Sequence, residues 1–543
     1  MPIVPPIQTT SKSSDKCYVY GLYSLSAMSN SKRKEIFIFL LCLLIGFALR
    51  FYTLDRKSLW LDEIYTFNDS RDNLQGQLKY YKENPTFLHP PLFFILTHLF
   101  YPFTKPERDL RIIPLIFGSL SIPMFYFLSR SFSPNIALPC TLSLTFMAYH
   151  ISLSQDGRSY SLLMFLGMAG LYFFLKHLET SKKQYLILVA LFFASLFYTS
   201  YSSIPFIALS QILWFYRPSE KSKKTTLSSF LTLNGLILLF CLPWIAFLAV
   251  HLKGQPLIAP IHTEDPGSFW FILYGVLQDW APNALLMIIS VILFMFFPFF
   301  SKFRKNALAL LAVFVLPIGG IYLFCKLFDF THFVTSRYFI NFLPLFLITL
   351  YLSLDAVEMK FERLKRILRL RLLFLILFIA SNIIILPLYY RSEKQDFRGL
   401  ANYLMGHIQD GDEIIVGGET YFLGLLHYFG IEPPKGRRYL LAYRKVSENE
   451  TEYFVPLIYK GKKFTISNSK TYWIQYVAEG NRVWVAVNKM TAKEIKKNYP
   501  FALKAYFDGS FLNFIRFPTD ASIYLLLWDP SSPEEKGIDM AIE

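Results

Sequence analysis

Long apolar segments without charged residues fill most of the first 390 positions of the chain. A helix that crosses a bilayer needs about 20 such residues, with a range near 17 to 25. The run 185–216 is charge-free and too long for one helix, but at about 1.5 Å per residue it suffices for two short ones. The sequence TSYSS (199–203) would form the turn between them. The other candidate spans are 36–54, 112–129, 134–153, 159–175, 227–250, 281–300, 306–325, 338–354 and 372–390.

Clusters of Lys and Arg between these segments predict the orientation, because cytoplasmic loops carry an excess of positive charge. An even number of crossings must separate any two cytoplasmic clusters, which requires two spans in 185–216. The same count places 89–103 and 269–280 outside, as juxtamembrane helices. We therefore expect a mainly α, polytopic protein of about 11 transmembrane helices, with the N-terminus cytoplasmic and the C-terminus outside. The clusters are Lys32–Lys34, Lys176 with Lys182–Lys183, Arg217–Lys224, Lys302–Lys305 and Lys360–Arg371.

Composition supports a membrane protein. Hydrophobic residues make up 53% of the 543 positions and charged residues only 17%, whereas soluble proteins carry about 25% charged residues. The net charge of +16 arises mainly from the clusters between apolar runs, so we expect no nucleic-acid partner. Four of the five cysteines lie in apolar runs and none forms a CxxC pair, which favours neither a disulfide framework nor a zinc site.

Three regions follow from these patterns. Residues 1–34 form a polar cytoplasmic N-terminus, although Met28 would also make a natural start, which leaves the origin of residues 1–27 open. Residues 35–390 form the transmembrane domain, whose first outer loop is 55–111. Residues 391–543, here called the tail domain, are expected to form an extracytoplasmic α/β domain. Its predicted elements are a helix in DFRGLANYLMGHIQ, a strand at 413–416, a helix ending at Gly430, and strands in KTYWIQYV and RVWVAV.

Polar residues on the predicted outer side form a candidate site. The first outer loop carries Asp62, Glu63 and His89. The next carries Asp156, Arg158 and Tyr160, and a later one carries Arg337 and Tyr338. A further outer loop contains His262, Glu264 and Asp265, a set that could chelate a metal. None of these charges lies deep in a span, so ion conduction is not indicated.

Carboxylates and arginines at one lipid surface suit sugar transfer from a lipid phosphate. An Asp or Glu can take the proton of an acceptor hydroxyl as it attacks, and an arginine can bind two phosphate oxygens at once. Because Asp62 and Glu63 lie about 100° apart on a helix, only one of them is expected to face a cleft. Structural alternatives exist for each residue: a helix cap, a proline helix start after His89, snorkelling arginines, and interfacial tyrosines.

The order of motifs resembles the GT-C superfamily of polytopic glycosyltransferases. The resemblance is to the bacterial branch that is similar to protein O-mannosyltransferases and the lipid A aminoarabinose transferase. Its motifs run in order, at suitable spacing, over most of the chain up to about residue 404. The matching pieces are LWLDEIYT (59–66), HPPLFFIL (89–96), RIIPLIFGSLSIPMFYFLSR (111–130), SQDGRSYSLL (154–163), SRYFINFLP (336–344) and KQDFRGLANYL (394–404).

This resemblance implies a polyprenyl-phosphate sugar donor and inversion at the anomeric carbon. It implies Asp62 as the catalytic base with Glu63 beside it, and a contribution from His89 to the cleft. Arg158, Arg337 and Tyr338 would lie near the donor phosphate, and Tyr160 and Asp156 would line the cleft. One departure matters: the relatives carry an Asp a few residues later, where this chain has Ser161-Leu162-Leu163, and Asp156 need not replace it. Metal dependence varies in the superfamily, so a divalent metal stays open.

The sequence therefore predicts a membrane glycosyltransferase, in a bacterial inner membrane, whose partners are a polyprenyl-phosphate-linked sugar, membrane lipids and an acceptor. The acceptor class (glycolipid, polysaccharide or protein), the sugar and the oligomeric state stay open. The alternative is a transporter or flippase of lipid-linked sugars, which should show internal repeats and broken helices with polar residues at the midplane. A non-enzymatic scaffold is a third class, and it would need no acid at position 62.

Overall fold

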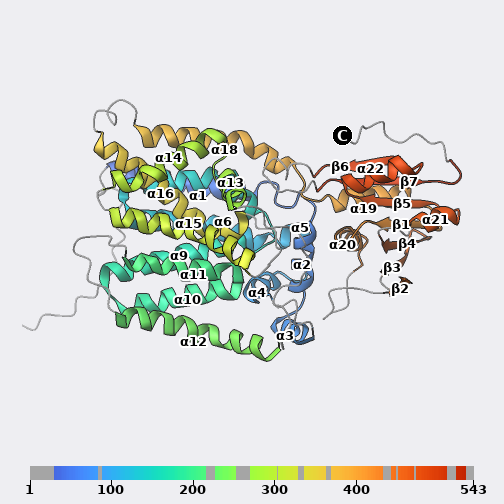
Figure 1. Ribbon diagram of the computed structural model, residues 1–543, viewed down its shortest axis with the longest axis horizontal. Coiled ribbons are helices and arrows are strands. Elements are labelled where there is room, and N and C mark those ends of the chain that lie inside the picture. Colours follow the sequence, from blue (N-terminus) through green and yellow to red (C-terminus); the bar gives the residue numbers. More distant parts are fainter. Residues whose placement is uncertain are drawn as a thin grey trace, which may run out of the picture.

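The computed structural model shows a long helical bundle at one end and an α/β domain at the other (Figure 1). A set of short helices lies between the two. The described residues are 30–83, 89–215, 227–251, 269–301, 304–327, 336–361, 369–431, 442–447, 450–469, 473–509 and 521–532. The first 29 residues and the candidate metal ligands His262, Glu264 and Asp265 lie outside them.

Each predicted span is helical over most of its described length. By length and composition, five helices of the described chain can cross a membrane, or up to seven if each of two bent pairs is one span. A mainly helical membrane protein is confirmed, while the number eleven stays a prediction. The bundle helices are α1 (Asn30–Phe51), α6 (Ile112–Phe132), α7 (Ala137–Phe146), α8 (Ala148–Ser154), α9 (Tyr160–Thr180), α10 (Lys183–Thr199), α11 (Ile204–Ser210), α12 (Leu227–His251), α14 (Ala284–Phe300), α15 (Arg304–Leu327), α16 (Leu343–Lys360) and α18 (Leu370–Arg391).

The long apolar run 185–216 is broken where the TSYSS turn was predicted. Helix α10 ends at Thr199, and Ser200 is extended, with φ −163° and ψ 139°. The Ser200 hydroxyl accepts a hydrogen bond from the Ser202 backbone N–H at 3.3 Å. A short 3₁₀ turn and α11 follow. The serine side chain thus satisfies a backbone group that the helix break leaves free.

A second break, between α7 and α8, bends that pair by 60°. Met147 is extended here, so the last carbonyls of α7 lose their helical partners. The guanidinium of Arg50 on α1 donates to the carbonyls of Leu144 at 3.0 Å and Thr145 at 3.3 Å. It also contacts Nδ1 of His150 at 2.8 Å. A buried cation therefore caps a helix C-terminus, where positive charge is favourable.

Five short helices of the described chain lie on the side of the bundle that faces the tail domain. Four of them follow α1 in the chain, and the fifth precedes α14. They are α2 (Leu61–Ser70), α3 (Leu74–Glu83), α4 (Leu92–His98), α5 (Pro106–Asp109) and α13 (Phe269–Trp280). Residues 272–280 of α13 meet α14 at 110°, which agrees with the prediction that 269–280 does not continue the span. In 89–103 only the seven residues of α4 form an α-helix.

The tail domain is built on a seven-stranded sheet of order β2-β3-β4-β1-β5-β7-β6. Strand β1 runs parallel to β4 and β5, and the other pairs are antiparallel. Its elements are α19 (Phe397–His407), β1 (Asp412–Val416), α20 (Glu419–Tyr428), β2 (Ala442–Ser447), β3 (Glu450–Tyr459), β4 (Lys462–Asn468), α21 (Trp473–Ala478), β5 (Val483–Val487), α22 (Lys489–Asn498), β6 (Ala502–Phe507) and β7 (Ile523–Trp528).

Most predicted tail elements have the expected type, but the predicted strand KTYWIQYV is wrong. Residues 470–472 lie outside the described chain, and 473–478 form helix α21. Aromatic and β-branched residues favour strands. Here the helix packs Tyr476 against the sheet and ends before Gly480, whose φ of +80° suits a glycine.

The two faces of the sheet are covered by different elements. Ile414 and Val416 of β1 pack with α19 and α20, while Ile415 between them packs on the opposite face with α22, as the two-residue period of a strand requires. The first core continues into the first outer loop, where it includes Leu59, Ile64, Phe67 and Leu110. Helix α2, which carries Asp62, therefore rests on the tail domain.

Candidate active site

Asp62 lies between two arginines, one from the loop between α8 and α9 and one from the turn before α16. Its Oδ2 is 4.0 Å from Nε of Arg158 and 3.9 Å from Nη1 of Arg337. The Asp62 side chain keeps 28% of its surface exposed, so a ligand can reach it. Arg158 is also fixed to α2 itself, because its Nη1 donates to the Asp62 carbonyl and to Oγ1 of Thr66, both at 3.1 Å. We call these three residues the Asp62 site.

Arg337 is held by aromatic rings. It lies in the 3₁₀ turn Ser336–Phe342 that precedes α16. Its guanidinium carbon is 5.1 Å from the ring centre of Trp60 and 5.9 Å from that of Tyr160. Such contacts attract the cation to the ring faces without neutralising it. These rings hold the Arg337 guanidinium beside Asp62.

Glu63, the neighbour of Asp62, has different surroundings. Its side chain is only 1% exposed, and Arg111 binds both carboxylate oxygens, at 2.8 and 2.7 Å. The backbone N–H of Gly157 donates to the same carboxylate at 2.6 Å. One acid of the pair therefore faces the arginines of the Asp62 site. The other joins α2, the start of α6 and the loop that carries Arg158.

Asp156 forms a buried contact with the start of the tail domain. Its Oδ2 is 2.6 Å from Nζ of Lys394, and its Oδ1 accepts from Nε1 of Trp60 at 2.9 Å. Burial acts to raise the pKa of Asp156, but the ammonium of Lys394 and the indole N–H outweigh it and lower the pKa. Asp156 is thus an anion held by its neighbours. It contacts Trp60 and Lys394 and makes no described contact with Asp62.

The remaining predicted residues lie around this centre. Tyr160 is buried at the first position of α9, under Arg337. Tyr338 is partly buried against the bundle core. His89 is exposed, and its ring centre lies 6.3 Å from that of Phe94 on α4, a helix that packs against α2. The structure brings Asp62, Arg158, Arg337 and Tyr160 together, and it places His89 beside Phe94 of α4.

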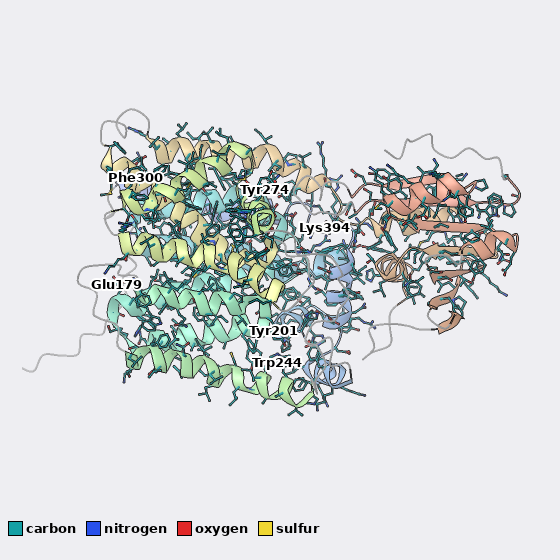
Figure 2. All side chains as sticks on the ribbon, in the orientation of Figure 1. Glu179, Tyr201, Trp244, Tyr274, Phe300 and Lys394 are labelled. Atoms are coloured by element: carbon teal, nitrogen blue, oxygen red, sulfur yellow. The ribbon has the colours of Figure 1, made fainter. Side chains whose placement is uncertain are left out.

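Three residues that pack around the Asp62 site were not among the predicted ones. They are Arg111, which pairs with Glu63, Trp60, which stacks under Arg337, and Lys394, which pairs with Asp156. All three lie in the motif pieces LWLDEIYT, RIIPLIF and KQDFRGL, so the signal was present. Lys394 is labelled in Figure 2 at the junction of the bundle and the tail domain.

Metal ligands do not converge in the described part of the chain. No group of three or more His, Cys, Asp or Glu side chains is placed to hold an ion there. The candidate ligands His262, Glu264 and Asp265 lie outside that part.

Comparisons with known proteins agree with this architecture. Residues 88–247 match the family described as dolichyl-phosphate-mannose-protein mannosyltransferase. The crystal structure of ArnT from Cupriavidus metallidurans in the apo state superposes with a TM-score of 0.51 at 12% identity, over 92% of this chain and 98% of that one. ArnT bound to undecaprenyl phosphate gives a TM-score of 0.50 at 12% identity, over 90% and 97%. No curated protein matches the chain.

These findings bear on different parts of the prediction. The mannosyltransferase family covers the segment from α4 to α12, and the ArnT structures share the fold of bundle and tail domain together. The predicted resemblance is confirmed: the chain is similar to GT-C polytopic glycosyltransferases, in the manner of ArnT and the protein O-mannosyltransferases.

Proposed function

We propose that this chain transfers a sugar from a polyprenyl-phosphate donor to an acceptor hydroxyl on the outer face of the membrane. The observation that carries the proposal is an accessible carboxylate, Asp62, which has one guanidinium at 4.0 Å and another at 3.9 Å, from two separate segments of the bundle. The ArnT structure with undecaprenyl phosphate supports the donor class. The acceptor is a glycolipid, a polysaccharide or a protein, and the membrane is a bacterial inner membrane.

In this reaction Asp62 takes the proton of the acceptor hydroxyl as its oxygen attacks the anomeric carbon. The bond from that carbon to the phosphate oxygen breaks at the same time, with inversion, and the electron pair leaves on the phosphate. Arg158 and Arg337 bind the oxygens of the departing phosphate. Stabilisation of developing charge by fixed cations is commonly the largest catalytic contribution, and a positioned base adds about 10²- to 10⁴-fold.

The burial of Glu63 supports a positioning role for this acid. Paired with Arg111, it cannot accept a proton from the acceptor without giving up a bidentate ion pair. It instead fixes α2 and Gly157, the residue before Arg158. The base and one phosphate cation are therefore held by the same carboxylate.

A transporter of lipid-linked sugars is the second candidate, and one observation favours it. The α7–α8 pair is broken within the bundle, and His150 of α8 is buried there in contact with Arg50 of α1. Broken helices with polar groups are typical of transporters. The break is capped by Arg50 itself, which gives these residues a structural role. The Asp62 site has no comparable structural role in a transporter.

Asp62→Asn separates the two candidates, because it removes the base and keeps the shape of the side chain. Envelope glycolipids and glycoproteins are compared by mass spectrometry in cells without the protein, with the wild type and with the variant. The proposal expects one sugar to be lost without the protein and not restored by Asp62→Asn. Asp72→Asn, an acid two residues beyond the end of α2, serves as the control and should restore it. Restoration by Asp62→Asn would favour the transporter.

A further inference from the structure

The entrance to α2 is bonded mainly to residues of the tail domain. The backbone N–H of Ser58 donates to Glu393 at 3.0 Å, and that of Leu61 donates to Gln395 at 2.9 Å. The N–H of Leu59 donates to the hydroxyl of Tyr428 at 2.7 Å. Three backbone groups that precede or begin α2 are thus satisfied by side chains more than 330 positions later in the chain. Helix starts usually find such partners in their own sequence neighbourhood.

Lys394 adds a charged contact to these hydrogen bonds. Its Nζ pairs with Asp156 at 2.6 Å and lies 4.2 Å from the ring centre of Trp60. Trp60 is the residue before α2, and its indole N–H donates to Asp156. The pair is shielded, because the side chain of Asp156 is 1% exposed and that of Lys394 is 24% exposed. Shielded, hydrogen-bonded pairs hold geometry better than exposed ones.

Both partners of Lys394, Trp60 and Asp156, lie next to residues of the Asp62 site. Trp60 lies under the guanidinium of Arg337, and only Gly157 separates Asp156 from Arg158 in a tight loop, where the Arg158 backbone N–H donates to the Asp156 carbonyl. A shift of Lys394 would therefore move the ring that supports one arginine and the loop that carries the other. Lys394 thus contacts the neighbours of both arginines, and Glu393 and Gln395 bond the residues at the start of α2.

We propose that Lys394 is a positioning residue for sugar transfer, and that the tail domain fixes the geometry of Asp62, Arg158 and Arg337 through it. This inference rests on the proposed function for its catalytic consequence. Its structural content, that Lys394 orders the entrance to α2, does not depend on the reaction. Misplacement by about 1 Å can cost a reaction about 100-fold, so loss of the contact should lower turnover by about 10- to 100-fold.

The test uses the full-length protein in lipid nanodiscs and two readouts. The first is deuterium uptake of the backbone amides of residues 58–66, and the second is kcat and KM for transfer from undecaprenyl-phosphate-linked sugar. Lys394→Met should raise the uptake and lower kcat, with a change in donor KM of less than about threefold. Lys493→Met, on the exposed surface of α22 in the same domain, should change neither.

A double-mutant cycle examines the partner. If Lys394 acts through Asp156, then Lys394→Met combined with Asp156→Asn should be no worse than the more damaging single variant. Additive losses, or wild-type kcat and uptake in a stable Lys394→Met, would overturn the proposal. Should Lys394→Met not fold, Gln395→Ala removes only the acceptor of the Leu61 N–H. It should still raise uptake at residue 61, and unchanged uptake there would equally overturn the proposal.

The uptake readout keeps this inference separate from the proposed reaction. Higher uptake in Lys394→Met together with full activity of Asp62→Asn would retain the positioning contact and overturn the assignment of the base. Inactive Asp62→Asn together with unchanged uptake and turnover in Lys394→Met would do the reverse.

Discussion

At the scale of single residues, two adjacent carboxylates differ completely in surroundings. On a helix they lie about 100° apart, so one faces the arginines and the other faces the protein. Asp62 keeps a partly exposed carboxylate between two cations that do not bond it tightly. Glu63 is enclosed by Arg111 and Gly157. The helical period predicts this division, but it does not predict the partner of Glu63, which lies 48 positions away.

Glu63→Gln should destabilise the protein strongly. The change leaves Arg111 buried with its charge uncompensated, and breaking a buried ion pair from one side costs about 3–5 kcal/mol. Thermal unfolding of the purified protein should show a marked fall in melting temperature. In Glu63→Gln with Arg111→Met the buried charge is gone, so the double variant should be more stable than Glu63→Gln alone. An unchanged melting temperature of Glu63→Gln would contradict the structural role.

Glu393 predicts a pH-dependent stability. Burial raises its pKa to about 7, and Asp396 acts in the same direction, while Lys57 and Arg111 oppose them. The folded state therefore disfavours the charged form. Ionised Glu393 therefore lowers the free energy of unfolding. This loss is absent below about pH 4.5, the ordinary pKa of a glutamate, grows between pH 4.5 and 7, and is complete above pH 7.

Glu393→Gln imitates the protonated form and can still accept from the Ser58 N–H. It should melt at a higher temperature than the wild type at pH 8, and the gap should shrink towards pH 5. Melting curves at several pH values between 5 and 8 measure this. A gap that widens as the pH falls would show that the charged form of Glu393 is the stabilising one.

At the scale of elements, the loop between α8 and α9 depends on a close approach to α2. A Cβ placed on Gly157 would lie 3.0 Å from Oε1 of Glu63 and 3.2 Å from its Cγ. Those atoms are held by Arg111 and cannot retreat freely. A side chain at position 157 would therefore push this loop away from α2. Arg158 follows directly and would move with the loop.

Gly157→Ala should push the loop away from α2 and separate Arg158 from Asp62. We expect transfer activity to fall by about tenfold or more, since small misplacements in a site are costly. Gly406→Ala, in α19, is the matched control. A Cβ there meets open space, and Ala is favoured over Gly in a helix by about 1 kcal/mol. Equal activity of the two variants would show that the loop tolerates the displacement.

The elements themselves were largely predictable, because hydropathy and helix breaks are local properties. The helix break at TSYSS and the helix–strand–helix order at the start of the tail domain followed from short stretches of sequence. KTYWIQYV was misassigned because its aromatic and β-branched residues favour a strand, while tertiary packing and Gly480 favour helix α21. The motif pieces contain Arg111 and Lys394, but their pairing with Glu63 and Asp156 could not be predicted, since pairing between distant segments depends on the assembled fold.

At the scale of the whole molecule, the candidate site lies where three parts of the chain meet. The loop 55–111 supplies Asp62, the bundle supplies Arg158 and Arg337, and the tail domain shares a hydrophobic core with the loop 55–111. In Figure 2, Lys394 is at the junction with the tail domain, whereas Glu179 and Phe300 lie at the opposite end of the bundle. A lipid with its phosphate at the junction would have its chain beside the bundle.

The last prediction concerns the side of the membrane on which each part of the chain lies. The positive clusters predict that the start of α15 is cytoplasmic and that the tail domain lies outside. In a variant without the five native cysteines, Lys305→Cys and Lys493→Cys add one exposed thiol on each predicted side. A membrane-impermeant maleimide should label Lys493→Cys in intact spheroplasts and Lys305→Cys only after lysis. Labelling of both before lysis would mean an even number of crossings between α15 and α22, contrary to the three predicted, and would rule out eleven spans. Labelling of Lys305→Cys alone would invert the protein and place Asp62 on the cytoplasmic face.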